Sequence, residues 1–593
     1  MNEIKESILY ARRRIEEVPQ AEIVDDIQWD DITQRWYIKI CISDIDSNND
    51  IIPKISMWYV TFPDTYPDGE VKVYPAVEGG IKNTYNHQNN NGHIAENGLW
   101  RSGNLCLSHN LDSLLHETVE PYDSEDKLLW NLQRAVRWVE AAANTNLVKE
   151  GDYYEVPQFV RIKPLILAYN EDSVSYMEWE GVSHNIGFLN IINVDDSQLY
   201  AENFYSLNGE LCKASRWGDY VKGKARNTIA GAWILLNKEP VINIWQAPNL
   251  FSELADAMAL QGRNLREDLR KVMPRFRDGK RHIIMVGFPV PEIAGRDNQL
   301  IHWEAFLLPH LSSGCLTRNG FRNTEKGWQA RDFLEILRPT LVLEWLNCDN
   351  YSLREIQNRG HFDRKMTSKK YLIIGAGTLG ASVGEMLVRS GVYNISIIDD
   401  DKYSIGNSAR HILEVDSVGK FKADEVCKRF NGINPNVTAS SINESLSMNN
   451  IGLIDSYDVI IDCTASNNVL SLLSSYTTHP KKHYFSISFG YKAENLFFSY
   501  QWGDSFDMSL FYNDLGNKIK KSEEAYMQGN LPWEGVGCWH PVFPAMAYDV
   551  QMAASVAIEL ISSFIESGKR KSQSYVFEKK YDQDGVVLGF ARI

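Results

Sequence analysis

The chain has 593 residues and a formal net charge of −16, with 61 lysines and arginines against 77 aspartates and glutamates. Its length exceeds what one hydrophobic core can organise and predicts roughly three or four domains. The acidic balance argues against non-specific binding to nucleic acid, which depends on neutralising phosphates.

The sequence also argues against a membrane or disulfide-stabilised protein. No uninterrupted apolar run approaches the roughly 20 residues that a spanning helix needs. The charged N-terminus lacks the apolar segment of a signal peptide. The eight cysteines are scattered without a CxxC pair, so we expect neither a disulfide framework nor a zinc site. We therefore expect a cytoplasmic protein without nucleic-acid or membrane partners.

Residues 1–150 have the pattern of an α+β domain. A charged amphipathic helix is predicted over 3–17, and the alternation in 37–42 and 55–60 is typical of antiparallel strands. Apolar spacing predicts a long helix over 124–143.

Residues 151–365 mix short apolar runs with turns. The runs 231–236 and 282–288 predict buried strands, and 251–274 predicts a helix, so this region is expected to be an α/β domain. It contains no phosphate-binding loop and no matched catalytic set.

From residue 366 the pattern is that of a Rossmann-type domain. A buried strand over 370–374 leads into a glycine loop, a helix over 378–391 and a second strand over 395–399. A later strand is predicted over 457–463. Alternating strands and helices imply a mainly parallel, doubly wound sheet.

The glycine loop is a candidate phosphate site. Gly375, Gly377 and Gly380 allow close backbone approach, and the following helix N-terminus offers unpaired N–H groups. Asp399 ends the next strand, where an acid binds ribose hydroxyls. An NAD-dependent oxidoreductase is compatible with these residues alone.

The residues after Asp399 resemble the ThiF/MoeB/ubiquitin-activating adenylation family. That family has an acid, a second acid two residues on, then Asn, Arg and, past a Val-Gly, a Lys; here these are Asp399, Asp401, Asn407, Arg410 and Lys422. The resemblance implies that Asp399 binds the ribose of ATP and that Asn407, Arg410 and Lys422 contact the triphosphate. Cations and amide donors suit carboxylate attack on a phosphorus that gains negative charge. Hydride transfer does not need Arg410 or Lys422, which favours adenylation.

The resemblance also implies Mg²⁺, with one departure from the family pattern. Ala465 stands where the family has a metal-ligating aspartate. Asp462, at the end of the later strand, is our candidate ligand, with Asp401 as an alternative. A plain strand-end cap is the other interpretation of Asp462. The family's four-cysteine zinc site is absent, so no zinc is expected.

Cys538 is the first candidate nucleophile. It lies between Gly537 and His540, downstream of the nucleotide motif. A thiol reacts as thiolate, and a nearby histidine or a helix N-terminus, here expected near Pro544, would activate it. Activating enzymes transfer the adenylated carboxylate to a cysteine in this region. A buried loop cysteine is the alternative.

Cys106 is the second candidate, and it depends on a different resemblance. The segment 61–67 (TFPDTYP), the loop at His87 and the run 103–107 (GNLCL) resemble a ubiquitin-conjugating core, which a long helix follows. The family's His-Pro-Asn tripeptide is not intact. His87, His93 and His109 are all candidates for oxyanion stabilisation, and a buried filler remains the alternative for Cys106.

The order of the modules resembles the activating–conjugating fusion proteins of bacterial CBASS anti-phage operons. This resemblance implies a conjugating-like domain over 1–150, a linker with an inactive adenylation-like domain over 151–365 and a ThiF-like domain over 366–593. It further implies a homodimer, a cGAS/DncV-like nucleotidyltransferase whose C-terminus is activated, and target proteins with lysine amines.

The resulting hypothesis is ATP-dependent adenylation of a protein C-terminus, a thioester relay from Cys538 to Cys106, and ligation to amines in the bacterial cytoplasm. Two alternatives remain open. One is activation of a sulfur carrier for cofactor biosynthesis, which would not need residues 1–150. The other is a non-catalytic scaffold for the nucleotidyltransferase.

Overall fold

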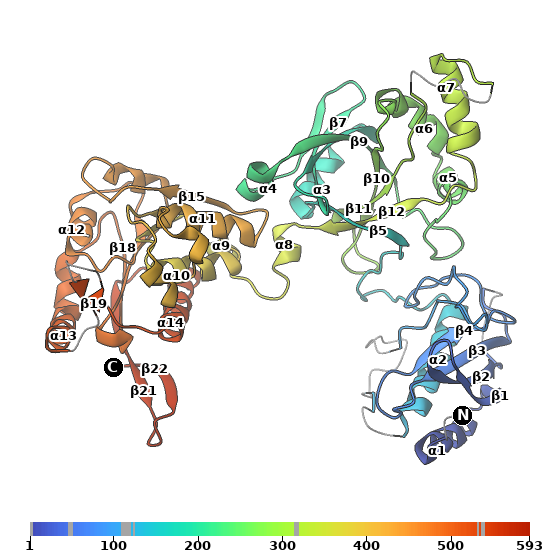
Figure 1. Cartoon of the computed structure of the whole chain (residues 1–593), viewed down its shortest axis with the longest axis horizontal. Coiled ribbons are helices and arrows are strands. Elements are labelled where there is room, and N and C mark those ends of the chain that lie inside the picture. Colours follow the sequence, from blue (N-terminus) through green and yellow to red (C-terminus); the bar gives the residue numbers. More distant parts are fainter. Residues whose placement is uncertain are drawn as a thin grey trace. The chain divides into compact units, whose positions relative to one another are not determined.

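The computed structural model describes residues 4–45, 51–107, 120–121, 125–313, 320–529, 533–534, 540–541 and 543–593. The chain forms two compact units, one of Met1–Ser215 with Asn227–Asn350 and one of Arg216–Arg226 with Tyr351–Ile593 (Figure 1). The short segment 216–226 therefore packs with the C-terminal unit, although it interrupts the first. Within it, Gly218 N–H donates to Pro435 C=O at 2.7 Å, ahead of helix α4 (Asp219–Lys224).

The N-terminal part of the first unit is a four-stranded antiparallel sheet flanked by two helices. The strands follow the chain in the order β1 (Ala21–Asp30), β2 (Arg35–Ile42), β3 (Ser56–Phe62) and β4 (Lys72–Pro75). Apolar residues of α1 (Glu6–Arg14) and α2 (Lys127–Ala143) share one hydrophobic core with them. The predicted strands and helices of this region are confirmed.

Tyr66 ties the turn between β3 and β4 to the start of α2. Its hydroxyl donates to Glu125 C=O at 2.7 Å and accepts the Leu128 N–H at 3.1 Å. The ring is buried against Phe62 with centroids 5.5 Å apart, and burial raises the pKa of Tyr66 to about 12. The aromatic-proline segment 61–67 therefore fixes where α2 begins.

The rest of the first unit is built on an eight-stranded mixed sheet. Its order is β5-β12-β11-β10-β9-β6-β7-β8, and β5 also pairs with β7. The strands are β5 (Arg161–Tyr169), β6 (Ile186–Asn193), β7 (Gln198–Ser206), β8 (Leu211–Ala214), β9 (Asn227–Leu235), β10 (Ile283–Val290), β11 (Leu300–Leu307) and β12 (Glu344–Asn350). The two predicted strands are confirmed as the parallel neighbours β9 and β10.

The single helix predicted over 251–274 is wrong. The structure has α5 (Phe251–Ala259) and α6 (Leu265–Val272) instead. Gly262 between them has φ +73°, a left-handed conformation that ends a helix, and Asn264 caps α6 with its side chain. Two further helices, α3 (Ser173–Glu180) and α7 (Glu325–Arg331), complete this region.

The C-terminal unit contains a second eight-stranded sheet, in the order β15-β14-β13-β16-β17-β18-β21-β22. The first five strands are parallel, as predicted: β13 (Tyr371–Ile374), β14 (Asn394–Ile398), β15 (Thr438–Ile442), β16 (Val459–Asp462) and β17 (Lys482–Phe489). The remaining strands extend the sheet in antiparallel fashion: β18 (Asn495–Gly503), β21 (Gln573–Tyr581) and β22 (Val587–Arg592). The strand order reverses at β13, which is where such sheets bind ligands.

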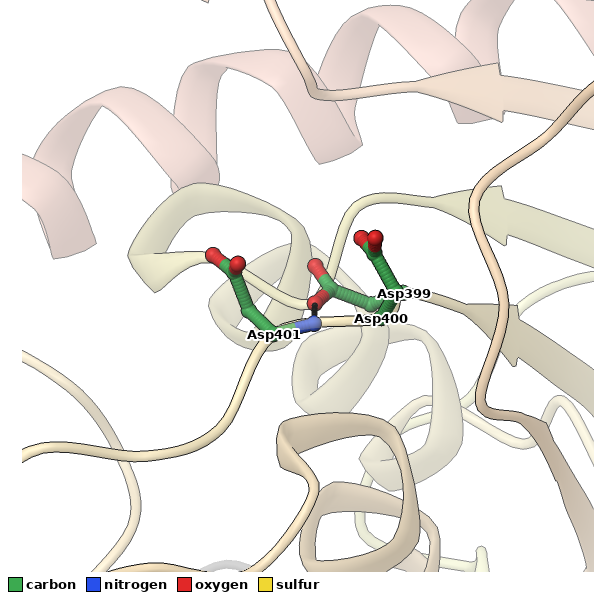
Figure 2. A group of neighbouring side chains, drawn as sticks. All are labelled: Asp399, Asp400 and Asp401. Atoms are coloured by element: carbon green, nitrogen blue, oxygen red, sulfur yellow. Dashed lines mark hydrogen bonds between the residues drawn. The ribbon is translucent and has the colours of Figure 1, made fainter.

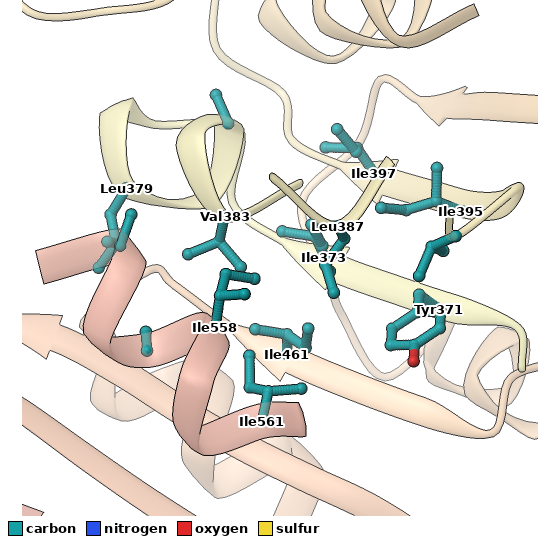
Figure 3. Close-up of a cluster of buried hydrophobic side chains, with 14 of the residues drawn as sticks. Tyr371, Ile373, Leu379, Val383, Leu387, Ile395, Ile397, Ile461, Ile558 and Ile561 are labelled. Atoms are coloured by element: carbon teal, nitrogen blue, oxygen red, sulfur yellow. The ribbon is translucent and has the colours of Figure 1, made fainter. Parts of the chain in front are cut away.

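Helices cover both faces of this sheet. One core joins alternate strand residues to α10 (Thr378–Arg389), α11 (Lys422–Ile433) and α14 (Ala547–Glu566); Figure 3 shows α10 and α14 packed on β13, β14 and β16. The other core uses the intervening strand residues with α12 (Asn467–Ser475) and α13 (Met508–Gln528). The short helices α8 (Leu353–Ile356) and α9 (Arg364–Thr367) precede β13, and β19 (Trp533–Glu534) pairs with β20 (His540–Pro541).

Among the described residues, α14 alone is long and apolar enough to cross a membrane by length and composition. Half of it is buried, with Ala553, Ala557 and Ile561 fully enclosed in the core. Packing against the sheet therefore accounts for its composition.

Gly384 sets how closely α10 and α11 approach, because a Cβ there would lie 2.6 Å from the Phe430 ring. We expect Gly384→Ala to lower the free energy of unfolding of the C-terminal unit by about 1–3 kcal/mol, the usual range for overpacking. Hydrogen–deuterium exchange of α10 peptides across a urea series measures it. Gly432→Ala on α11 is the control, since no neighbour lies within 4 Å; equal losses in both variants would contradict the packing argument.

Candidate active site

The glycine loop joins β13 to α10 in a tight turn. Gly375 has φ +98°, and a Cβ on Gly380 would lie 2.0 Å from the Gly375 carbonyl oxygen. Gly377 caps α10, and a Cβ there would meet nothing within 4 Å. The loop is therefore closed on its protein side and open beside the helix N-terminus, where N–H groups and the helix dipole attract phosphate. A nucleotide phosphate fits this cradle.

Asp399 connects this loop to the turn that follows β14. Its Oδ2 accepts the Ala376 N–H at 2.6 Å and its Oδ1 accepts the Asp401 N–H at 2.8 Å. Burial raises the pKa of Asp399, while the two N–H groups and the charge of Lys422 act in the opposite direction. The carboxylate thus holds two backbone segments at one edge of the sheet.

Three consecutive acids occupy that turn, as Figure 2 shows. Carboxylate oxygens of Asp399, Asp400 and Asp401 lie within 4.8 Å of one another, and the last two side chains are exposed. Carboxylate oxygens are the ligands that Mg²⁺ prefers. Asp401, our alternative magnesium ligand, belongs to this group.

Lys422 is brought to the same turn by backbone pairing. Its N–H donates to Asp401 C=O at 2.9 Å, and its Nζ lies 2.9 Å from Asp401 Oδ2. The lysine side chain is only 12% exposed, whereas that of Asp401 is 69% exposed. A cation is therefore fixed at the first residue of α11, with its carboxylate partner facing solvent.

Asn407 and Arg410 lie on the 3₁₀ turn after this loop. Asn407 Oδ1 accepts the Ser404 N–H at 3.0 Å, which closes a capping box. Arg410 donates to Phe543 C=O, and its guanidinium lies 5.9 Å from the centre of the Phe543 ring. Arg410 thus connects the nucleotide motif to the segment just before α14. The nucleotide contacts assigned to these residues stay predictions.

His411 is a residue of this site that the sequence reasoning missed. Its Nδ1 accepts the Leu413 N–H at 3.1 Å, so its Nε2 carries the proton and donates to Ala376 C=O at 2.9 Å. Burial lowers the pKa of His411, with Lys422 and Arg410 contributing to the same effect. A neutral imidazole therefore supports the glycine loop. No local motif signals this role, because the bond spans 35 residues.

Asp462 lies at the end of β16 and is 1% exposed. Its Oδ1 accepts the N–H of Thr464 at 3.0 Å and the hydroxyl at 2.6 Å, and its Oδ2 accepts the Ser486 hydroxyl at 3.1 Å. Burial raises the pKa of this carboxyl. Three donors and full burial match the strand-end cap interpretation, and the magnesium assignment stays a prediction. Ala465 follows with φ +54°, a left-handed conformation.

Cys106 lies beside the sheet of the first unit, far along the chain from these residues. Leu105 N–H donates to Val73 C=O at 3.0 Å and Cys106 N–H donates to His87 C=O at 2.8 Å. The thiol is half-buried; burial raises the pKa of Cys106, and the charge of Glu155 raises it further. This thiol is held in a defined position in its protonated form near neutral pH.

The candidate histidines are placed differently from one another. His87 adjoins Cys106 through its carbonyl, whereas His93 is exposed and pairs with Ser102 through its backbone. His109 lies outside the described residues. Cys538 also lies outside the described residues. The helix expected near Pro544 begins at Ala547.

Comparison with known proteins identifies two regions of this chain. A family model described as the Cap2 central linker domain matches residues 145–351, and a model of the ThiF family matches residues 348–573. A molybdopterin-synthase adenylyltransferase of Haemophilus influenzae is 29% identical over 119 residues, covering 20% of this chain and 49% of that protein. A crystal structure of Escherichia coli MccB with AMPCPP and MccA aligns at TM-score 0.29 and 18% identity, covering 40% of this chain and 65% of that one.

A much longer similarity spans both units. The ATP-dependent ubiquitin transferase-like protein Cap2 of Enterobacter hormaechei subsp. hoffmannii is 31% identical over 572 residues, which is 93% of each chain. The resemblance to the CBASS fusion proteins is thereby confirmed. With its linker and ThiF regions in the matching order, this chain belongs to the Cap2 family of ATP-dependent ubiquitin transferase-like proteins.

Proposed function

We propose that this protein activates the C-terminal carboxylate of a protein with ATP, carries it as a thioester on Cys538 and then Cys106, and ligates it to lysine amines. The observation that carries the proposal is the Lys422–Asp401 pair beside an open glycine loop. A fixed cation and exposed carboxylates next to a phosphate cradle suit nucleotide chemistry at a phosphorus atom.

The residues at the loop divide into distinct roles. Gly375, Gly377 and Gly380 form the phosphate cradle, and Asp399 would accept from the ribose hydroxyls. Asn407, Arg410 and Lys422 would contact the triphosphate. The exposed acids Asp400 and Asp401 would hold Mg²⁺, with Asp462 as the buried candidate; the ion would neutralise phosphate charge there.

In the first step, a carboxylate oxygen of the substrate attacks the α-phosphorus of ATP. The bond to the β-phosphate oxygen breaks, giving an acyl-adenylate and pyrophosphate. Lys422 and Arg410 offset the negative charge that develops on the α-phosphate oxygens. His411 keeps the loop in place while this occurs, because it bonds the Ala376 carbonyl.

Two thiol transfers follow. The Cys538 thiolate attacks the acyl carbon and AMP leaves, forming a thioester. The Cys106 thiolate then attacks that thioester and the Cys538 thiolate leaves. Finally a lysine amine attacks the Cys106 thioester, forming an amide as the amine loses a proton and the thiolate leaves.

The N-terminal sheet supports the second thiol as a conjugating-type site. Cys106 directly follows a strand-like pairing with β4, and α2 packs across the same sheet. We infer a ubiquitin-conjugating-like domain over 1–150, a linker with an inactive adenylation-like domain over 151–365 and the adenylation domain over 366–593. We further infer a bacterial cytoplasmic homodimer.

We propose a cGAS/DncV-like nucleotidyltransferase as the protein whose C-terminus is activated, with conjugation priming anti-phage signalling. Sulfur-carrier activation is the second candidate, favoured by the local similarity to a molybdopterin-synthase adenylyltransferase. It would not need Cys106. A scaffold role, suggested by Ala465, would need neither thiol nor ATP.

We expect Lys422→Ala to reduce ATP–pyrophosphate exchange at least about 100-fold, the usual loss when one electrostatic contact to a transition state is removed. The assay uses the purified chain, ATP·Mg²⁺ and the nucleotidyltransferase. Lys428→Ala is the matched control, since that lysine lies on the same helix and is 68% exposed. If Lys422→Ala exchanges pyrophosphate at the wild-type rate, the assignment of the nucleotide site is contradicted. If the wild-type protein shows no exchange, the scaffold role is supported.

Replacing each of the two cysteines is expected to block a different step of the reaction. Cys538→Ala should retain pyrophosphate exchange but form no thiol-sensitive adduct with the nucleotidyltransferase on a non-reducing gel. Cys106→Ala should retain the Cys538 adduct and form no amide-linked conjugate. Normal conjugation by Cys106→Ala would eliminate the two-thiol relay.

The neutral state of His411 predicts a pH dependence of nucleotide affinity. Burial lowers the pKa of His411 below its ordinary value of 6.5, so the neutral form persists at neutral pH and is lost as the pH falls through that lowered pKa. Protonation then removes the acceptor for Leu413 N–H and loosens the loop. His411→Gln keeps one donor and one acceptor without titrating. Calorimetric titration with a non-hydrolysable ATP analogue should show that this variant loses less nucleotide affinity at acidic pH than the wild type. Identical affinity–pH profiles would refute the role of His411.

A further inference from the structure

Glu155 contacts the Cys106 site from outside the N-terminal sheet. It lies on the irregular segment that follows α2, and its Oε2 accepts the His87 N–H at 2.9 Å and the Asn86 Nδ2–H at 3.1 Å. The same oxygen lies 3.8 Å from His87 Nδ1. One carboxylate thus engages three donor or ring atoms of a two-residue turn.

That turn needs support from outside. His87 has φ +53°, a left-handed conformation that a residue other than glycine adopts at some cost. Trp138 on α2 donates through its indole N–H to Asn86 C=O at 3.2 Å, while Glu155 binds the N–H side. The turn is therefore fixed between α2 and the following segment. The orientation of the His87 carbonyl is thereby fixed, and this carbonyl accepts the Cys106 N–H at 2.8 Å.

We propose that Glu155 is a positioning residue of the Cys106 site: its carboxylate fixes the Asn86–His87 turn to which the Cys106 amide is bonded, and it places a negative charge at that turn. The proposal deepens the proposed function, on which its catalytic meaning rests. It places a determinant of the thiol's chemistry beyond the four strands and α2 that resemble a conjugating core.

The electrostatics agree with this geometry. Burial is the larger cause of the raised pKa of Cys106, and the charge of Glu155 is the second. Among the residues that the structure describes, two further ionisable groups are His87, on the turn itself, and Arg134 of α2, whose Nε donates to Leu107 C=O. A thiol with a raised pKa is a poorer leaving group, so its thioester would react more slowly with any nucleophile.

The test measures alkylation of Cys106 by iodoacetamide in the full-length protein as a function of pH, resolved by mass spectrometry of the Cys106 peptide. Removing the charge in Glu155→Gln should lower the midpoint of the profile and speed alkylation at about pH 7.5 by roughly threefold or more, because a like charge stabilises the neutral thiol. The glutamine still offers an acceptor to the turn. Glu155→Asp keeps the charge and should remain nearer the wild-type profile.

Glu96→Gln is the control, because Glu96 is exposed within the same loop region and does not contribute to the raised pKa of Cys106. An unshifted Glu155→Gln profile, or an equal shift in Glu96→Gln, overturns the inference. The conjugation assay separates it from the proposed function. If the Glu155→Gln profile shifts but Cys106→Ala conjugates normally, Glu155 still influences the Cys106 thiol, but that thiol has no part in conjugation.

Discussion

Ala376 is held at both of its backbone polar groups, and the candidate nucleotide site depends on these two hydrogen bonds. Its N–H donates to Asp399 at the end of β14, and its C=O accepts from His411. Both partners lie far from the loop in sequence but near it in the sheet. A loop of glycines would otherwise be free to move, since glycine restricts the backbone least. Because both peptide groups that flank Ala376 are held, the next residue, Gly377, is fixed in position while its surroundings stay open.

This clamp also orders the charges around the loop. Asp399 is largely withdrawn from water, which disfavours its anion, but two backbone N–H groups compensate for the lost solvent. The second of them belongs to Asp401, whose side chain then meets Lys422. The position of the lysine cation is thus linked to the glycine loop through one buried carboxylate. The neutral imidazole of His411 adds support without adding another positive charge.

The sequence predicted the parts of this arrangement that local pattern encodes. Buried strands, the glycine spacing and the acid after β14 identify the parallel half of the sheet, because each is a short-range signal. The antiparallel strands β18, β21 and β22 carry no comparable motif. The break at Gly262 was missed because apolar periodicity continues through it. His411 and Glu155 could not be found, since each acts through hydrogen bonds across 35 or more residues.

Both candidate sites use a carboxylate that accepts two hydrogen bonds from a neighbouring loop or turn, yet the two carboxylates lie in different electrostatic surroundings. The charge of Lys422 acts on Asp399, and those of Lys422 and Arg410 act on His411 beside the same loop, so these cations suit phosphate groups there. Glu155 lies near a half-buried thiol, which favours the protonated form. On the proposed function, these surroundings agree with the chemistry at each site. Chemistry at the α-phosphate requires positive charge at the loop, whereas a thiol with a raised pKa is released slowly from its thioester. The segment after α2, which lies between α2 and β5 within the first unit, then belongs to the second site as well.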